Sequence, residues 1–143
     1  METYKEMIIL IAEDDDGHAE LIQSGLEISG ICNKMLRFTN GEEVWRFLSG
    51  TADDIIRDKS KTYLLLLDIN MPKMDGIEVL KRLKANQELK DIPVMMLTTT
   101  DDPREVEACY KLGCNVYINK PVDFKKFAET LKRLGLFIQV VKI

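Results

Sequence analysis

The chain has 143 residues, of which 45% are hydrophobic, and it carries a formal net charge of −4 at pH 7. A chain of this length is expected to form one domain, since domains average roughly 100–200 residues, and its hydrophobic content is enough for a buried core. The acidic balance argues against a nucleic-acid partner, which needs a clustered basic surface, and no apolar run approaches the roughly 20 residues that span a membrane.

Short apolar segments alternate with amphipathic segments along the chain. In chain order we predict a strand at Met7–Ala12, a helix near Gly17–Ile28, a strand at Met35–Phe38, a helix near Glu42–Leu48, a strand at Tyr63–Leu67, a helix near Ile77–Ala85, a strand at Pro93–Leu97, a helix at Pro103–Leu112, a strand at Val116–Ile118 and a helix from Asp123 to about Leu134. Since the strands are apolar without alternation, they indicate an α/β fold with a doubly wound, five-stranded parallel sheet that helices cover on both faces.

Two segments lie outside this pattern. Ser49–Lys61 is polar, and we predict a solvated loop with a helical turn at Asp53–Arg57. Residues 135–143 are unusually apolar for a terminus, and they could extend the last helix, form a strand or pack as an irregular arm. We treat 1–143 as one domain with a core of about 7–134 and an apolar C-terminal extension at 135–143. Exposed apolar residues often mark a contact surface, so we expect the extension to support a homodimer; capping of the domain's own core is the alternative.

The three cysteines bear on the compartment. Cys32, Cys109 and Cys114 are odd in number and have no metal-ligand spacing, so we expect them to stay reduced. Cys109 and Cys114 are expected to pack in the core. Because the N-terminus also lacks the basic start of a signal peptide, the sequence predicts a cytoplasmic protein.

Charged residues follow three of the predicted strands. Glu13, Asp14 and Asp15 come directly after the first strand. Asp68 follows the third strand, and Lys120 lies just past the fifth. The carboxyl ends of parallel strands form the edge at which α/β sheets bind ligands. Since Mg²⁺ is typically held by one or two carboxylates plus phosphate oxygens, and lysine is a common phosphate ligand, the pattern predicts a site for Mg²⁺ and a phosphoryl group.

Four motifs occur in order at successive strand ends. They are Glu13-Asp14, Asp68-x-x-Met71-Pro72-x-Met74-Asp75-Gly76, Leu97-Thr98 and Lys120-Pro121. Over about Met7 to Leu134 the chain resembles the receiver domain of two-component response regulators, which implies the flavodoxin-like receiver fold. The long polar loop, segment 92–99 and the apolar tail are similar to those of stand-alone regulators of the cyanobacterial-phytochrome partner type, so no second domain is expected.

The resemblance implies a role for each motif residue. Asp68 would accept phosphate from a histidine kinase, while Thr98 and Lys120 would contact the phosphoryl group. The implied Mg²⁺ ligands are Glu13, Asp14, Asp68 and the backbone carbonyl of Asn70. A shift of one residue in register would instead select Asp14 and Asp15. Receiver domains commonly have Glu-Asp directly after the strand, which favours the first pair.

The resemblance also implies a conformational switch. Phosphorylation would draw Thr98 toward the phosphoryl group and let the Tyr117 ring turn inward, which would remodel the face formed by the fourth helix, the fifth strand and the fifth helix. Ordinary core packing is the alternative role for Tyr117. The Lys120–Pro121 bond is expected to be cis, as is frequent in this family. His18, the single histidine of the chain, begins the first helix near the acidic loop. It could approach the site, but we favour an exposed helix residue.

The favoured function is therefore a phosphorylatable signalling switch that contacts a downstream protein. Such a protein catalyses its own phosphorylation and dephosphorylation without being a conventional enzyme. One alternative is a receiver-like module that binds partners without phosphorylation. Another is a phosphatase with an aspartyl nucleophile, but that class commonly has an acid two residues after the nucleophile, where this chain has Asn70.

Overall fold

Strands and helices alternate along the chain in the computed structural model, which describes residues 7–99, 102–121 and 123–141. The elements are β1 (Ile8–Ala12), α1 (Asp16–Ile28), β2 (Met35–Phe38), α2 (Gly41–Ser49), β3 (Tyr63–Leu67), α3 (Gly76–Lys84), β4 (Val94–Thr98), α4 (Pro103–Leu112), β5 (Val116–Asn119) and α5 (Phe124–Val141). Every predicted element is present, and each bound agrees with the predicted one or differs from it by a single residue, except for the end of α5.

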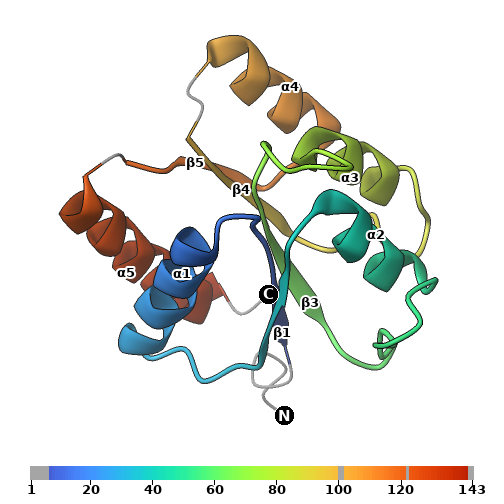
Figure 1. The fold of residues 1–143 in the computed structure, drawn as a ribbon, viewed down its shortest axis with the longest axis horizontal. Coiled ribbons are helices and arrows are strands. Elements are labelled where there is room, and N and C mark those ends of the chain that lie inside the picture. Colours follow the sequence, from blue (N-terminus) through green and yellow to red (C-terminus); the bar gives the residue numbers. More distant parts are fainter. Residues whose placement is uncertain (1–6, 100–101, 122, 142–143) are drawn as a thin grey trace.

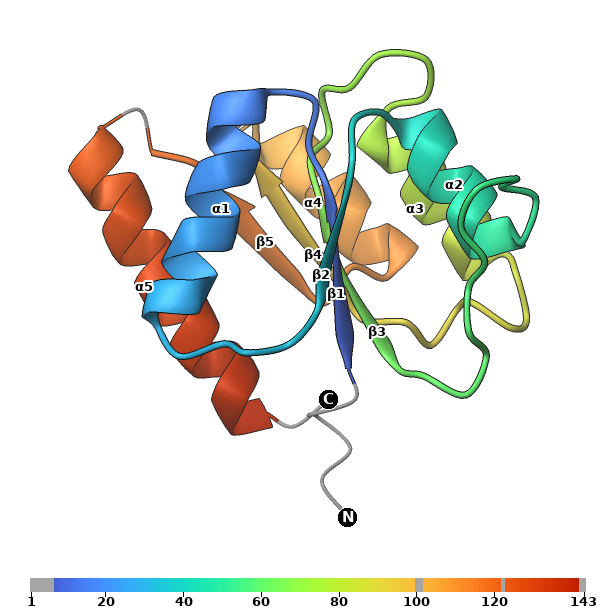
Figure 2. The same ribbon diagram turned by 60° about the horizontal axis from the view of Figure 1, so that its bottom comes forward.

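The five strands form one parallel sheet in the order β2-β1-β3-β4-β5. Helices α1 and α5 pack on one face, and α2, α3 and α4 pack on the other (Figures 1 and 2). Successive β1 residues point to opposite faces, so Leu10 joins the core beneath α2 and α3 while Ile9 and Ile11 join the core beneath α1 and α5. The predicted doubly wound α/β fold is confirmed.

Side-chain caps set where several helices begin. The side-chain Oδ1 of Asn40 accepts from the backbone N–H of Glu43, so α2 starts at Gly41. Asp75 accepts in the same way from Glu78, which starts α3 at Gly76. Acceptors at these positions satisfy backbone donors that the first helical turn leaves unpaired.

Helix α5 continues past Leu134 to Val141, which decides among the three conformations predicted for the tail. Leu131, Leu134 and Ile138 form one apolar stripe that lies in the core shared with α1. In addition, Gln139 Nε2 donates to the carbonyl oxygen of Ser29, at 2.6 Å, just after the end of α1. Residues 135–141 therefore extend the last helix across the end of α1.

The polar segment between α2 and β3 is a loop, as predicted, but it contains bends and no helical turn at 53–57. Its conformation is held by side chains. Arg57 Nε donates to the carbonyl oxygen of Leu48 at 3.1 Å, and Tyr63 Oη accepts from the N–H of Asp58 at 2.9 Å. These bonds tie the loop to the end of α2 and the start of β3, and the predicted helical turn at 53–57 was wrong.

The burial of the cysteines and the length of the helices bear on two further predictions. Cys109 and Cys114 are buried as expected, whereas Cys32 is exposed. Among the described residues, no helix combines the length and the apolar character that crossing a bilayer would require.

Candidate functional site

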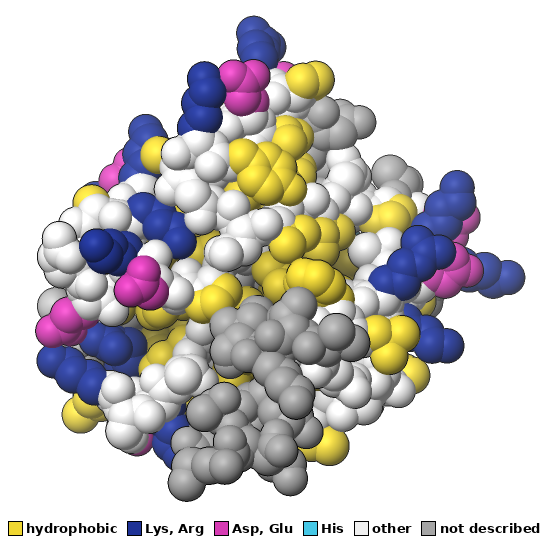
Figure 3. Space-filling view, turned by 180° about the vertical axis from the view of Figure 1, so that it is seen from behind, with side chains coloured by type: hydrophobic (Ala, Val, Ile, Leu, Met, Phe, Trp, Pro, Cys, Tyr) yellow, Lys and Arg dark blue, Asp and Glu magenta, His cyan; other side chains and the backbone are white. Residues whose placement is uncertain are grey.

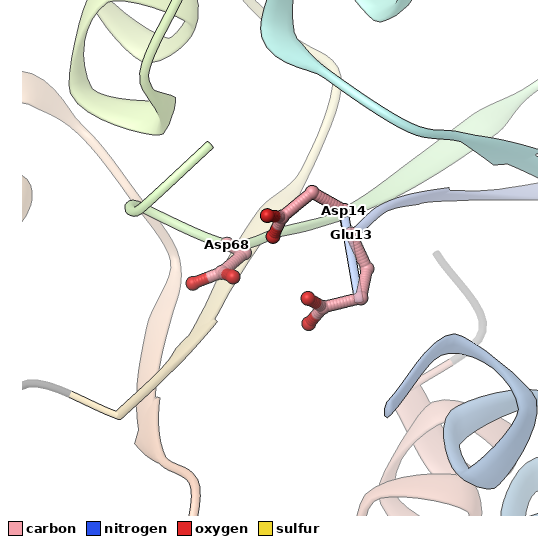
Figure 4. Close-up of side chains that lie close together, drawn as sticks. All are labelled: Glu13, Asp14 and Asp68. Carbon is pink, nitrogen blue, oxygen red and sulfur yellow. The ribbon is translucent and has the colours of Figure 1, made fainter. Parts of the chain in front are cut away.

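Three carboxylates gather at the carboxyl ends of β1 and β3. Glu13 and Asp14 directly follow β1, and Asp68 directly follows β3, the neighbouring strand. Each offers one oxygen, and these oxygens all lie within 4.8 Å of one another (Figure 4). Strands β1 and β3 are where the strand order reverses, which is the ligand-binding position of open α/β sheets.

Backbone contacts fix the two loops that carry these acids. The N–H of Asp68 donates to the carbonyl oxygen of Ala12 at 3.1 Å, and the N–H of Glu13 donates to that of Phe38 at 3.0 Å. The guanidinium of Arg37 donates twice to the carbonyl oxygen of Glu13, at 3.0 and 2.8 Å. These contacts fix the backbone of both loops at the strand ends, so the positions of the three acids follow from it.

Asp15 has a different role from its two neighbours. Its Oδ1 accepts from the N–H of His18 at 2.9 Å, which makes Asp15 the N-cap of α1. The group of mutually close carboxylates contains Glu13 and Asp14 and leaves Asp15 out. Of the two pairings considered from the sequence, the geometry favours Glu13 with Asp14.

The loop from Asp68 to α3 can close only around glycine. A Cβ at Gly76 would lie 2.1 Å from the carbonyl oxygen of Asp68, and the N–H of Gly76 donates to the carbonyl oxygen of Ile69 at 2.8 Å. Within this loop Asn70 is exposed, and its N–H lies 3.4 Å from Asp68 Oδ1. The close approach keeps the start of α3 against the backbone of Asp68.

Lys120 reaches the carboxylates from the end of β5. Its side chain is buried, and its ammonium forms an ion pair with Glu13 and lies 3.5 Å from Asp68 Oδ2. The backbone N–H of Lys120 donates to the carbonyl oxygen of Thr98 at 2.6 Å, which ties the end of β5 to the end of β4. A single cation therefore faces two buried acids.

Burial dominates the electrostatics of Glu13. Desolvation raises its pKa from 4.5 to about 7, although the hydrogen bond and charge of Lys120 oppose that rise. Neighbouring Asp68 adds to the rise through like-charge repulsion. A divalent cation among these acids would relieve that repulsion, and the all-oxygen donor set suits a hard ion such as Mg²⁺.

Thr98, the last residue of β4, carries an unpartnered hydroxyl. Its side chain is fully buried, and within the described part of the chain Thr98 Oγ1 has no hydrogen-bond partner. Buried polar atoms in native proteins nearly always have a partner. The hydroxyl is therefore free to donate to a group that enters the site, as an anionic oxygen would.

Comparison with known proteins identifies the family. The family model of the response regulator receiver domain matches residues 9–132. The chain belongs to the response regulator receiver family.

Relatives of this receiver domain agree with that assignment. It is 33% identical to response regulator Rcp1 of Synechocystis sp. over 91% of this chain and 87% of Rcp1. The solved Mn²⁺-bound form of Rcp1 has a TM-score of 0.84 and 32% identity over 94% of this chain and 96% of its own. A receiver domain from Rhodospirillum rubrum has a TM-score of 0.87 and 43% identity over 94% of both chains. The phosphorylated cyanobacterial phytochrome response regulator RcpA has a TM-score of 0.81 and 30% identity over 93% of this chain and 94% of its own.

The family assignment confirms the predicted function at the level of the class. Receiver domains take phosphate from histidine kinases, bind Mg²⁺ at an acidic pocket and act on downstream partners. The protein is a phosphorylatable signalling switch of a two-component system.

Tyr117 of the receiver domain lies on β5, apart from the acidic cluster. Its ring is half-buried against the core beneath α2, α3 and α4, and its backbone N–H donates to the hydroxyl of Tyr110 at 3.0 Å. Among the described residues every peptide bond is trans, so the prediction of a cis Lys120–Pro121 bond was wrong.

His18 lies beside Lys120 of the site, so of its two predicted positions the less favoured one is found. Its ring is half-buried, and His18 Nδ1 lies 3.3 Å from Lys120 Nζ. The one available signal in the sequence was its position in the first turn after the acidic loop.

Proposed function

We propose that Asp68 is the residue that accepts the phosphoryl group, with Lys120 and Thr98 as its catalytic partners. The observation that carries this proposal is the convergence of three carboxylates and one buried lysine at the ends of β1, β3 and β5. Glu13 and Asp68 both face Lys120, and of these two Asp68 is the one that follows the central strand β3.

We further propose that Glu13, Asp14, Asp68 and the backbone carbonyl of Asn70 hold Mg²⁺. Support comes from the oxygen-only donor set and from the Mn²⁺-bound form of Rcp1. When bound, Mg²⁺ neutralises part of the charge between the carboxylates and the incoming phosphoryl oxygens.

The proposed reaction transfers a phosphoryl group from the phosphohistidine of a kinase. A carboxylate oxygen of Asp68 supplies the electron pair for a new P–O bond while the P–N bond breaks, and the histidine nitrogen keeps the electron pair of that bond. Lys120 would turn its ammonium from Asp68 toward a phosphoryl oxygen, and Thr98 Oγ1 would donate to another. Both donors lie at the edge of the site before the reaction, so each needs only a local movement to meet the incoming negative charge.

The proposed output lies on the face formed by α4, β5 and α5. Movement of Thr98 toward the phosphoryl group would open space near Tyr117, and the ring would turn inward. Hydrophobic side chains gather on the face seen in Figure 3, below α4. A cavity of about 290 Å³ on this side is lined by Val116, Ile118, Thr130, Arg133, Leu134 and Phe137. We propose that this face contacts a second copy of the chain or a downstream protein.

Intact mass measurement tests the phosphorylation site. The protein is incubated with Mg²⁺ and acetyl phosphate, and a gain of one phosphoryl group is expected. Asp68→Asn should abolish the gain because an amide oxygen is a poor nucleophile, whereas Asp15→Asn, the matched change at the helix cap, should retain it. A phosphoryl gain that persists in Asp68→Asn would place the nucleophile elsewhere. No gain in the wild type, with no beryllofluoride binding, would favour a module that works without phosphorylation.

A further inference from the structure

Among the described residues, the ammonium of Lys120 has three neighbours that can accept hydrogen bonds. Two are the proposed site acids, Glu13 and Asp68, and the third is His18 Nδ1 at 3.3 Å. An ammonium group has three N–H donors and no acceptor. The three neighbours therefore match the three donors of a lysine that is only 3% exposed.

The imidazole ring is held in this position from two sides. The backbone N–H of His18 donates to the N-cap Asp15, which fixes the first turn of α1. On its other side the ring meets Phe127 of α5 edge to face, with the centroids 5.8 Å apart and an interplanar angle of 87°. His18 thus bridges α1, α5 and the lysine at the end of β5.

The contact between Lys120 Nζ and His18 Nδ1 implies one tautomer of the ring. Because a lysine ammonium can only donate, an Nδ1 that accepts from it leaves the ring proton on Nε2. The ring also lines a cavity of about 440 Å³ together with Gly17, Glu20, Leu21, Ser24, Pro121 and Phe127.

We infer that His18 is a positioning residue for Lys120, a role that rests on the proposed phosphoryl transfer to Asp68. In the unphosphorylated protein the ring nitrogen Nδ1 accepts one ammonium N–H. Without that acceptor the ammonium would shift toward Asp68, whose Oδ2 lies 3.5 Å from Lys120 Nζ in the resting site. A tighter ion pair would lower the reactivity of the Asp68 carboxylate. On phosphorylation Lys120 turns toward the phosphoryl oxygens, and its bond to His18 breaks.

Nitrogen NMR of the histidine side chain tests the resting contact. The chain contains one histidine, so ¹⁵N-histidine labelling reports a single ring. At alkaline pH, where the free ring is neutral, we expect the Nε2–H tautomer with Nδ1 shifted by hydrogen bonding. Lys120→Met should remove that shift, and Mg²⁺ with beryllofluoride should remove it in the wild type. An Nδ1–H tautomer, or an Nδ1 signal that Lys120→Met leaves unchanged, would overturn the inference.

Two substitutions test the consequence for phosphorylation. His18→Leu removes the acceptor, whereas His18→Asn can place an amide oxygen near the position of Nδ1. With acetyl phosphate and Mg²⁺, we expect His18→Leu to lower the phosphorylation rate about tenfold, the size of one lost hydrogen bond to a charged group, and His18→Asn to restore most of it. Equal rates in all three proteins would refute the positioning role. Failure of the wild type to take phosphate would instead sink the proposed function, while the resting NMR signal would still test the contact.

Discussion

Glu13 shows what burial does to a single residue of this site. Its side chain is about 1% exposed, and desolvation raises its pKa from 4.5 to about 7 despite the nearby Lys120 ammonium. Between pH 4.5 and about 7 the Glu13 carboxylate binds a proton in the folded state and largely releases it in the unfolded state. Protonation of Glu13 therefore stabilises the fold below about pH 4.5, and this contribution is lost as the pH rises through about 7.

Chemical denaturation of the metal-free protein tests this pH dependence. We expect the Glu13 contribution to the free energy of unfolding to fall by at most about 3 kcal/mol between its two pKa values. The Glu13→Gln variant does not titrate at this position and should lack that component. If the free energies of unfolding of the two proteins ran parallel across this pH range, the pKa of Glu13 would not be raised.

At the residue scale the sequence predicts the acids and the lysine well, because parallel strands bring their carboxyl ends to one edge. Asp68 and Lys120 meet there whatever the details of the helices. His18 escapes such reasoning, since its contact depends on how α1 and α5 pack and on the direction of one long lysine side chain. A local sequence motif specifies neither the packing of these two helices nor the direction of that side chain.

Helix α5 illustrates what can be predicted for an element. Its start followed from local pattern, but its end did not, because the apolar tail suited a helix, a strand or an arm equally well. The contacts that decide the matter are distant in sequence: Ile138 packs in the core with α1, and Gln139 bonds Ser29. We propose that residues 135–141 are part of the domain's fold rather than a separate extension.

Two adjacent substitutions in α5 test this proposal. Ile138 is 2% exposed, whereas Phe137, one residue earlier, is 44% exposed. Ile138→Ala should lower the free energy of unfolding by about 2–4 kcal/mol, since it leaves a cavity in a packed core. Phe137→Ala should cost less than about 1 kcal/mol. Urea denaturation measures both, and similar small losses would mean that the end of α5 is not part of the cooperative fold.

For the molecule as a whole, the exposed apolar residues are distributed unevenly. Three large exposed side chains lie on the two helices next to β5: Tyr110 on α4, and Leu136 and Phe137 on α5. Two others lie elsewhere: Ile28, 81% exposed, at the end of α1, and Ile56, 84% exposed, in the loop before β3. If the α4–β5–α5 face forms the proposed homodimer, a charge placed among the first group should disrupt it.

Light scattering of two glutamate variants tests the dimer. Phe137→Glu should shift the protein toward the monomer, because desolvating an unpaired carboxylate in an interface is costly. Ile28→Glu is the matched control on another face and should leave the mass unchanged. The comparison is made with and without Mg²⁺ and beryllofluoride. A wild type that is monomeric in both conditions, or a dimer unaffected by Phe137→Glu, would exclude this face as the dimer interface.

The bond between Tyr110 and Tyr117 has a consequence for solubility. Strand β5 is the last strand of the sheet, and an open sheet edge offers backbone donors to any passing extended chain. The N–H of Tyr117 is already donated to the hydroxyl of Tyr110. A foreign strand that adds to this edge would have to displace a helix-borne phenol before it could form a continuous ladder. One tyrosine on α4 thus occupies a backbone donor of the β5 edge that edge-to-edge pairing would need.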